Sequence, residues 1–392
     1  MIEHNYHEKY LGALDYPYAD ECIHQTTEIL SKVTREFPEE YAWAQQELAC
    51  IARWYHYDIP ATIQYFLNIQ KTDSLYYYVD AQLELASLYR HQLKDYEKAI
   101  NALLNIQHED DAEQYANAQC RIGNIYRLVL HDFIQAKIHY DKVQHNDDPE
   151  SFASAQYSLG YMYRNDLNDW ETAMSFYQKV QHADSPLKYA WAQSSLGDIA
   201  QYHLKNNELA IQHYCNANPE DNYNIYSNAI NHLGNLYLKM GKLTLAEKTF
   251  LTIKKYDPDE DYAYAQNNIG VVYVNRKQYH KAKDYYHKVK RKYSQDAYDL
   301  AQSNLGILFH IHIRDLKRAI RYYNNVKKPS ENAHINTLTS YAKSQWNLGI
   351  IYQCKVKNIS KALKHYRNIK PKHSEEFYEK AQKKITYLSE VK

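Results

Sequence analysis

Four arginines at a fixed spacing are the first residues of this sequence that could do chemistry. Arginine keeps its charge at physiological pH and presents a planar fork of N–H donors, which suits carboxylate and phosphate groups. A row of arginines could therefore hold an extended acidic segment or the C-terminus of a peptide. The alternative is that each arginine pairs with an Asp or Glu of its own chain, because exposed ion pairs are common. The four residues, each 37 positions apart, are Arg53, Arg90, Arg127 and Arg164.

Asparagines form a second candidate column nearer the C-terminus. A side-chain amide both donates and accepts a hydrogen bond, so a row of amides could hold a peptide backbone whatever the peptide's sequence. The alternative is that asparagine is simply tolerated at a half-exposed helix position. The column comprises Asn268, Asn304 and Asn347.

The chain carries no net charge, but its charges are unevenly distributed. Residues 276–392 contain 26 Lys+Arg and 9 Asp+Glu, a net charge of +17, which leaves −17 for the preceding residues. A basic face could bind nucleic acid or an anionic membrane, and the contrast also allows two copies to associate head to tail. Alternatively, lysines near helix C-termini only complement the helix dipole. Two columns carry the basic residues: Lys281, Arg318 and Lys361, and Lys290, Lys327 and Lys370.

The sequence contains no catalytic or metal-binding motif. The five cysteines are scattered without C-x-x-C spacing, and neither H-E-x-x-H nor G-x-S-x-G occurs. Three histidines, His108, His145 and His182, recur 37 residues apart, which is too far for one metal ion. Capping of helix ends is their predicted role. We therefore expect a protein that is not an enzyme and that needs neither a cofactor nor a metal.

Targeting signals are equally scarce. The N-terminus lacks the apolar core of a signal peptide, and no apolar stretch approaches the roughly 18 residues that a membrane span needs. The odd number of cysteines does not suggest a disulfide framework. The sequence therefore predicts a cytoplasmic protein.

A repeat of about 37 residues positions all of these columns. An Ala-Gln pair or a close variant recurs ten times, mostly 37 residues apart, and an aromatic residue stands three positions before each alanine position. A small residue follows five positions after it. The apolar spacing around this segment is that of an amphipathic helix, called helix A. The small residues are Ala49, Ala86, Gly123, Gly160, Gly197, Gly234, Gly270, Gly306 and Gly349.

A second helix, helix B, follows helix A after a short turn. It opens at a small residue such as Ala136, with an aromatic such as Tyr140 four positions later. Glycine inside a helix costs about 1 kcal/mol relative to alanine, so the glycine column predicts a close approach between the two helices. The turn carries Asp or Asn at one offset, which predicts an N-cap for helix B. This column is missing in the repeats that begin at Tyr226 and Tyr262, where the turn is one residue shorter.

The spacing of these residues resembles the tetratricopeptide repeat. The segment Leu233 to Tyr237, followed by Ala246 and Phe250, has that family's spacing without gaps, and other repeats are similar to SEL-type repeats. The resemblance implies that the A helices line a concave groove. Helical spacing then predicts which positions face that groove. Counted from the small residue of each repeat, they are the positions six before, two before, one after and five after, together with the adjacent position four after. We call these positions the groove columns.

We therefore predict an all-α fold, a right-handed superhelical α-solenoid of about ten antiparallel helix pairs. Residues 1–38 are predicted to form a degenerate N-terminal capping repeat, and residues 39–374 nine tetratricopeptide-like repeats with an insertion at 329–339. Residues 375–392 are predicted to form a C-terminal capping helix. The polar exposed face of that helix carries Lys380, Lys383 and Lys384.

The predicted function is a protein–protein interaction scaffold or adaptor that holds a peptide or protein segment, an acidic one being a candidate, in the concave groove. A solenoid that binds nucleic acid or membrane through its basic C-terminal convex face is one alternative, and a peptide-sensing regulatory receptor is another. The carboxylate clamp of chaperone-binding tetratricopeptide domains is not expected. That clamp has Lys three positions before the glycine, where Cys120 and Asn231 stand in this chain.

Overall fold

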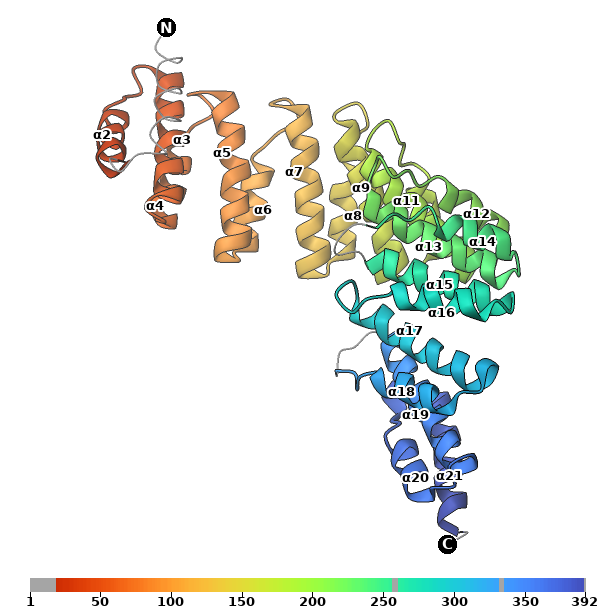
Figure 1. Ribbon diagram of the computed structural model, residues 1–392. Helices are drawn as coiled ribbons and strands as arrows, with labels where there is room; N and C mark the ends of the chain where they lie inside the picture. The colour runs from red at the N-terminus through yellow and green to blue at the C-terminus, as the bar shows by residue number, and fades with distance from the viewer. Residues whose placement is uncertain (1–18, 256–259, 331–334, 391–392) are drawn as a thin grey trace. The chain divides into compact units, whose positions relative to one another are not determined.

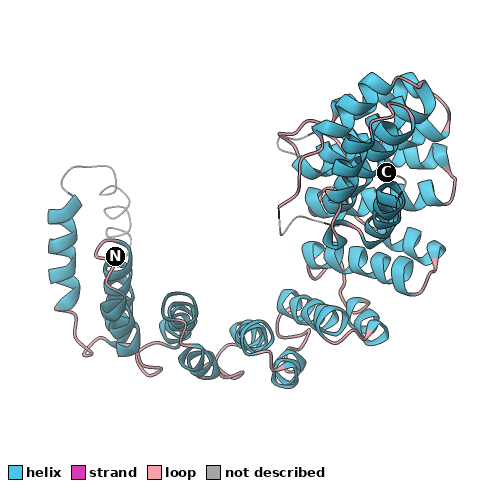
Figure 2. Cartoon of the chain, turned by 90° about the horizontal axis from the view of Figure 1, so that it is seen from below, coloured by secondary structure: helices cyan, strands magenta, loops and turns pink. Residues whose placement is uncertain are grey.

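The computed structural model describes residues 19–255, 260–330 and 335–390, and every regular element in these ranges is helical (Figures 1 and 2). The helices occur as consecutive A and B pairs, which confirms the predicted all-α repeat fold. The chain divides into two compact units, residues 1–192 and 193–392, and the boundary falls inside helix α11 (Pro186–Asp198).

In the first unit, each A helix packs against the B helix that follows it, and the A helices α3 and α5, and α7 and α9, also touch one another (Figure 1). Three A helices end in a π-helical turn. The helices are α2 (Ala19–Ser31), α3 (Pro38–Trp54), α4 (Ile59–Asn68), α5 (Leu75–Leu88), α6 (Tyr96–Leu104), α7 (Ala112–Ile125), α8 (Phe133–Asp141), α9 (Pro149–Tyr161) and α10 (Trp170–Tyr177), with π turns η2 (Tyr89–Leu93), η3 (Tyr126–Leu130) and η4 (Met162–Asp166).

In the second unit the same pairing continues, and the A helices α13, α15, α17, α19 and α21 pack side by side. The elements after α11 are η5 (Ile199–His203), α12 (Asn207–Cys215), α13 (Tyr223–Lys239), α14 (Leu243–Phe250), α15 (Glu260–Asn275), α16 (Tyr279–Lys288), α17 (Gln295–Ile307), η6 (Leu308–Ile313), α18 (Leu316–Asn325), α19 (Ile335–Cys354), α20 (Ile359–Arg367), the 3₁₀ turn η7 (Pro371–His373) and α21 (Glu375–Glu390).

The glycine column lies directly against the buried aromatic of helix B in the same repeat. A Cβ placed on Gly160 would lie 2.7 Å from the ring of Tyr177, which is fully buried. Real side chains do not approach so closely, so only glycine admits the ring at this distance. The other glycines of the column meet an aromatic ring in the same way, which confirms the predicted close approach of the two helices.

The glutamine of the Ala-Gln pair is a buried link between helices A and B. In five repeats its Oε1 accepts a hydrogen bond from an asparagine at the end of helix B, as in the 2.8 Å bond from Asn68 to Gln45. In three repeats a histidine ring nitrogen contacts the same oxygen, as between His139 and Gln119 at 2.7 Å. These bonds satisfy a buried amide that would otherwise destabilise the fold.

The ends of the A helices differ between repeats. Five repeats end helix A in a π turn, and the shorter repeats of α13 and α15 have none. The longer repeats of α3 and α19 also lack a π turn but keep the N-cap residues Asp58 and Asn358. A π turn accommodates one extra residue within a helix. The predicted N-caps also differ between the two classes. Asp95, for example, accepts a hydrogen bond from the Lys98 amide, whereas Lys242 and Gln278 make no side-chain cap.

The loops between repeats in the first unit are linked by hydrogen bonds and ion pairs. A basic side chain in one loop contacts an aspartate of the next loop, as between His108 and Asp147 at 2.9 Å and between His145 and Asp184 at 2.9 Å. The ring of His108 also lies edge-on to Tyr115. These histidines therefore join neighbouring repeats, whereas the sequence had predicted that they cap helix ends.

The predicted terminal and inserted segments are only partly described. Residues 1–18 of the expected N-terminal capping repeat and residues 331–334 of the expected insertion lie outside the described residues. Within the expected N-terminal repeat the structure describes helix α2. Helix α19 begins at Ile335, inside the expected insertion, and α21 begins at Glu375, the first residue of the expected C-terminal cap. The division of the chain into two caps and nine repeats stays a prediction.

Candidate functional site

The predicted arginine column lies at the C-terminal ends of the A helices. Arg90, Arg127 and Arg164 fall inside the π turns η2, η3 and η4, and Arg53 lies in the last turn of α3. All four side chains are half-buried. A π turn has more residues per turn than an α-helix, so residues after it point in directions that regular helical spacing does not predict.

Two of these arginines are paired within the chain. The guanidinium of Arg53 lies 2.5 Å from the carboxylate of Glu84 in the next A helix and 4.7 Å from the ring of Trp54. Arg127 contacts Asp166 at 3.5 Å, and its side chain is only 11% exposed. Arg164 also interacts within the chain. The structure thus provides intrachain partners for most of the column, and its role in binding a guest stays a proposal.

The groove columns of the first two repeats are acidic. Glu47, Asp80 and Glu84 occupy these columns around Cys50 and Arg53. Burial, and then the charge of Glu84, raise the pKa of Asp80. Burial and the neighbouring carboxylates raise the pKa of Cys50 to about 11, so this thiol is not an activated nucleophile.

The groove columns of the second unit converge on a depression with a volume of about 260 Å³. It is built by four successive A helices, α13, α15, α17 and α19. Asn268 donates a hydrogen bond to Asn235 at 2.9 Å, and Asn304 donates one to Asn267 at 2.9 Å, so the amides link neighbouring helices. The residues lining the depression are Asn235, Tyr264, Asn268, Leu300, Ser303, Asn304, Thr339, Ser340 and Lys343.

The third asparagine of the predicted column has a different position. Asn347 donates to the backbone carbonyl of Lys343 at 2.9 Å and does not line the depression. Lys343 itself does line it, six positions before Gly349. Sequence reasoning did not single out Lys343, although it lies in a column predicted to face the groove. Its position six residues before Gly349 was the signal in the sequence that could have identified it.

Lys343 is a half-buried cation. Burial lowers the pKa of its ammonium group, and within the described residues the ammonium makes no ion pair or hydrogen bond. Removing an ammonium from water without a counter-ion is unfavourable. An anion bound in the depression would therefore stabilise this side chain.

A second depression, of about 350 Å³, follows on the next pair of A helices, α19 and α21. The indole of Trp346 is held in place by the rings of Tyr366 at 5.4 Å and Phe377 at 6.4 Å. Lys380 is ion-paired with Glu376. The residues lining this depression are Trp346, Lys380, Lys383, Lys384 and Tyr387.

The two predicted basic columns differ in their surroundings. Each cation of the first column stacks on an aromatic ring of helix A, with Lys281 over Tyr273 at 5.2 Å as an example. Arg318 also contacts Asp315 at 3.3 Å. The members of the second column are exposed and, within the described ranges, make no ion pair. They are Lys290, Lys327 and Lys370.

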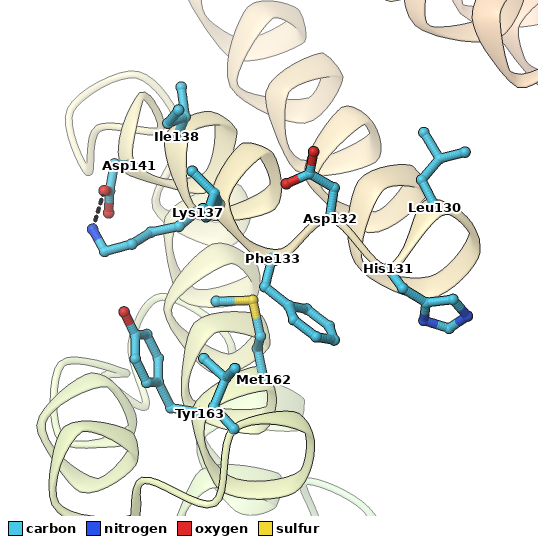
Figure 3. Close-up of a pocket in the computed structure, with 11 residues that line it drawn as sticks. Leu130, His131, Asp132, Phe133, Lys137, Ile138, Asp141, Met162 and Tyr163 are labelled. Carbon is cyan, nitrogen blue, oxygen red and sulfur yellow. Dashed lines mark hydrogen bonds and ion pairs between the residues drawn. The ribbon is translucent and has the colours of Figure 1, made fainter.

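The largest depression described lies in the first unit and has a volume of about 680 Å³ (Figure 3). It is formed by α8 and by the ends of the π turns η3 and η4. The ion pair between Lys137 and Asp141 borders it, whereas Phe133 and Met162 make its floor apolar (Figure 3). These side chains form no constellation of acid, base and nucleophile.

Two further features of the described residues bear on function. No group of three or more His, Cys, Asp or Glu side chains in these residues is placed to hold a metal ion. None of the helices described is both long enough and apolar enough to cross a membrane.

The fold and these columns define a repeat protein built from helix pairs. Models of the tetratricopeptide repeat match residues 154–185, 227–260 and 264–296. The repeats in these three segments are therefore of the tetratricopeptide type, a class of repeat that supports a protein-interaction scaffold. No curated protein matches the sequence.

Several solved structures share the helical-repeat architecture. Pseudomonas aeruginosa PilF is 20% identical, covers 60% of this chain and 98% of its own, and has a TM-score of 0.43. The antigen c5321 of uropathogenic Escherichia coli, with an SLR fold, is 16% identical, covers 87% and 79%, and has a TM-score of 0.43. Human IFIT1, solved as a dimer with PPP-AAAA, is 14% identical, covers 94% and 85%, and has a TM-score of 0.43. Likeness at this level carries no inference about function.

Proposed function

We propose that the chain is a protein-interaction scaffold that holds an extended protein segment against the A helices of its second unit. The observation that carries the proposal is the depression formed by Asn235, Asn268 and Asn304 together with Lys343. These residues come from four successive A helices, so a bound segment would run across the helices.

The amide groups favour recognition of a peptide backbone. Asn268 and Asn304 each donate one N–H to a neighbouring amide, which holds the side chains in a defined orientation. An amide has two N–H donors and an oxygen that accepts, so each side chain keeps hydrogen-bonding capacity for a guest. Backbone groups are present in every peptide, and a scaffold that uses them can accept more than one sequence.

The test is selection from a library of random 12-residue peptides by the full chain, followed by affinity measurements on the selected peptides by fluorescence anisotropy. Asn268→Ala combined with Asn304→Ala should weaken binding of the selected peptides about tenfold or more, because each lost hydrogen bond contributes roughly 0.5–1.5 kcal/mol. Methylation of the peptide's backbone N–H groups should weaken binding to the wild type in the same way.

Asn324 provides a matched control, because it is an exposed asparagine on helix B of the same unit. Asn324→Ala should leave the affinity of the selected peptides unchanged. Peptides that bind the double variant as tightly as the wild type would show that the amides do not hold the guest. A library that yields no binding peptide would contradict the proposed function itself.

A further inference from the structure

Resting on the function proposed above, we infer that the guest is an acidic segment whose carboxylates bind Lys343 on α19 and Lys383 and Lys384 on α21. The amide depression and the lysine depression lie on successive A helices, and α19 contributes to both. From α15 and α17 to α21 the lining side chains change from asparagine to lysine. The guest therefore meets amides on α15 and α17 and positive charge on α19 and α21.

Lys343 gives the strongest reason to expect a carboxylate. Lys343 lines a depression together with Asn304, Ser303 and Ser340. None of these groups carries a negative charge, and no described residue forms an ion pair with the ammonium. A carboxylate in the depression would accept a charge-assisted hydrogen bond from the ammonium.

The second depression combines positive charge with an apolar surface. Lys384 is half-buried and Lys383 is exposed, and within the described part of the chain neither has an ion-pair partner. The indole of Trp346 on α19 lines the same depression, together with Tyr387, which is 56% exposed. This surface suits acidic residues that alternate with apolar ones.

The spacing of the helices indicates the spacing of the acidic residues. Packed helices lie roughly 8–10 Å apart, and an extended peptide advances about 3.3 Å per residue. Lys343 and Lys384 lie on two successive A helices, α19 and α21. Acidic side chains about three residues apart would therefore reach both lysines.

A peptide fits these observations better than a nucleic acid. Single-stranded nucleic acids bind through successive exposed aromatic platforms along a basic groove. In the second unit the columns next to the lysines carry asparagine and serine, which suit a peptide backbone. The experiment below therefore includes an oligonucleotide, and its tighter binding would contradict a peptide guest.

The experiment uses the full chain and two fluorescein-labelled 12-residue peptides of Gly, Ser and Leu. One peptide carries glutamate at every third position, and the other carries glutamine at the same positions. We expect the glutamate peptide to bind at least tenfold more tightly at 100 mM salt and to lose this advantage as salt rises, because ion pairs are screened. Lys343→Gln combined with Lys384→Gln should abolish the difference between the two peptides.

Lys317→Gln combined with Lys364→Gln is the matched control, because both lysines are exposed on B helices of the same unit. This variant should preserve the preference for glutamate. Circular dichroism at increasing temperature establishes that each variant is folded. In contrast to the lysine variant, Asn268→Ala combined with Asn304→Ala should weaken both peptides by the same factor.

The outcomes separate this inference from the proposed function. If both peptides bind equally well to the wild type and to the lysine variant, but more weakly to the asparagine variant, the inference is wrong and the proposed function stands. If neither peptide binds, both are contradicted. A 12-nucleotide oligo(A) that binds more tightly than the glutamate peptide and depends on Lys343 and Lys384 would overturn the inference in favour of nucleic acid.

Discussion

The groove columns of the first two repeats and those of the second unit have the same helical positions and opposite chemistry. Two positions before the small residue, the early repeats carry Glu47 and Glu84, whereas α15 and α17 carry Asn268 and Asn304. Six positions before it, Asp80 in α5 corresponds to Lys343 in α19.

The repeat therefore determines where a groove side chain lies, whereas the charge of that side chain differs from one repeat to another. Arg53 neutralises part of the early acidic group through Glu84. Lys343 has no such partner in the described residues. The early columns are therefore partly neutralised within the chain, whereas no described residue neutralises Lys343 in the late columns.

The largest expected effect comes from giving the second unit the chemistry of the first. The triple variant combines Asn268→Glu, Asn304→Glu and Lys343→Asp. Its carboxylates would face those of the acidic guest, and such like-charge repulsion costs several kcal/mol of binding free energy. We expect the affinity for the glutamate peptide to fall by roughly a hundredfold or more, measured by fluorescence anisotropy. An unchanged affinity would show that the columns do not determine which guest binds.

A second prediction compares the glycine repeats with the second repeat, where Ala86 and Leu103 stand in place of glycine and an aromatic. Gly160→Ala should lower the free energy of unfolding by about 1–3 kcal/mol, because the new methyl group overlaps the ring of Tyr177. Unfolding in urea measures this loss. Adding Tyr177→Leu should recover part of it, as the natural pair in the second repeat implies.

The control for this packing prediction is Ala86→Gly. It should destabilise the second repeat by about 1 kcal/mol, because glycine is a poorer helix former where no ring needs the space. Purely additive effects of Gly160→Ala and Tyr177→Leu would mean that the two positions are not coupled through contact.

The smallest expected effect concerns the histidines that contact the buried glutamines. Burial and Lys142 lower the pKa of His139 from an ordinary value of 6.5 to about 4, and burial also lowers the pKa of His213 and His365. Between these values the unfolded chain binds protons that the folded chain does not. The free energy of unfolding should therefore fall as pH drops from about 6.5 towards 4.

Urea unfolding across this pH range measures that dependence. Replacing His139 by Gln removes one titrating group from the first unit, and replacing His213 and His365 removes two from the second, so the pH dependence should flatten more in the second case. A stability that is independent of pH between 4 and 6.5 in the wild type would contradict the prediction.

The repeat and its packing could be predicted because they depend on local spacing. Gly160 lies in helix A and Tyr177 in helix B of the same repeat, with a short turn between the two helices. Their spacing along the sequence therefore predicts that they pack against each other. The Asp and Asn N-caps, such as Asp95, depend only on residues within the same turn. The candidate site was predicted less completely. Of the predicted asparagine column, Asn268 and Asn304 line the depression, whereas Asn347 does not, and Lys343 was not singled out.

Residue spacing and size alone predict the all-α repeat, the positions that pack between helices and the columns that carry the polar side chains. These follow from helix periodicity and from residue size, which act within one repeat. Only the tertiary structure decided that Arg53 pairs with Glu84, that the buried glutamines join helices A and B, and that Lys343 meets three asparagines in one depression. Such contacts join side chains on different helices, and they depend on how those helices are staggered and on where a π turn redirects them.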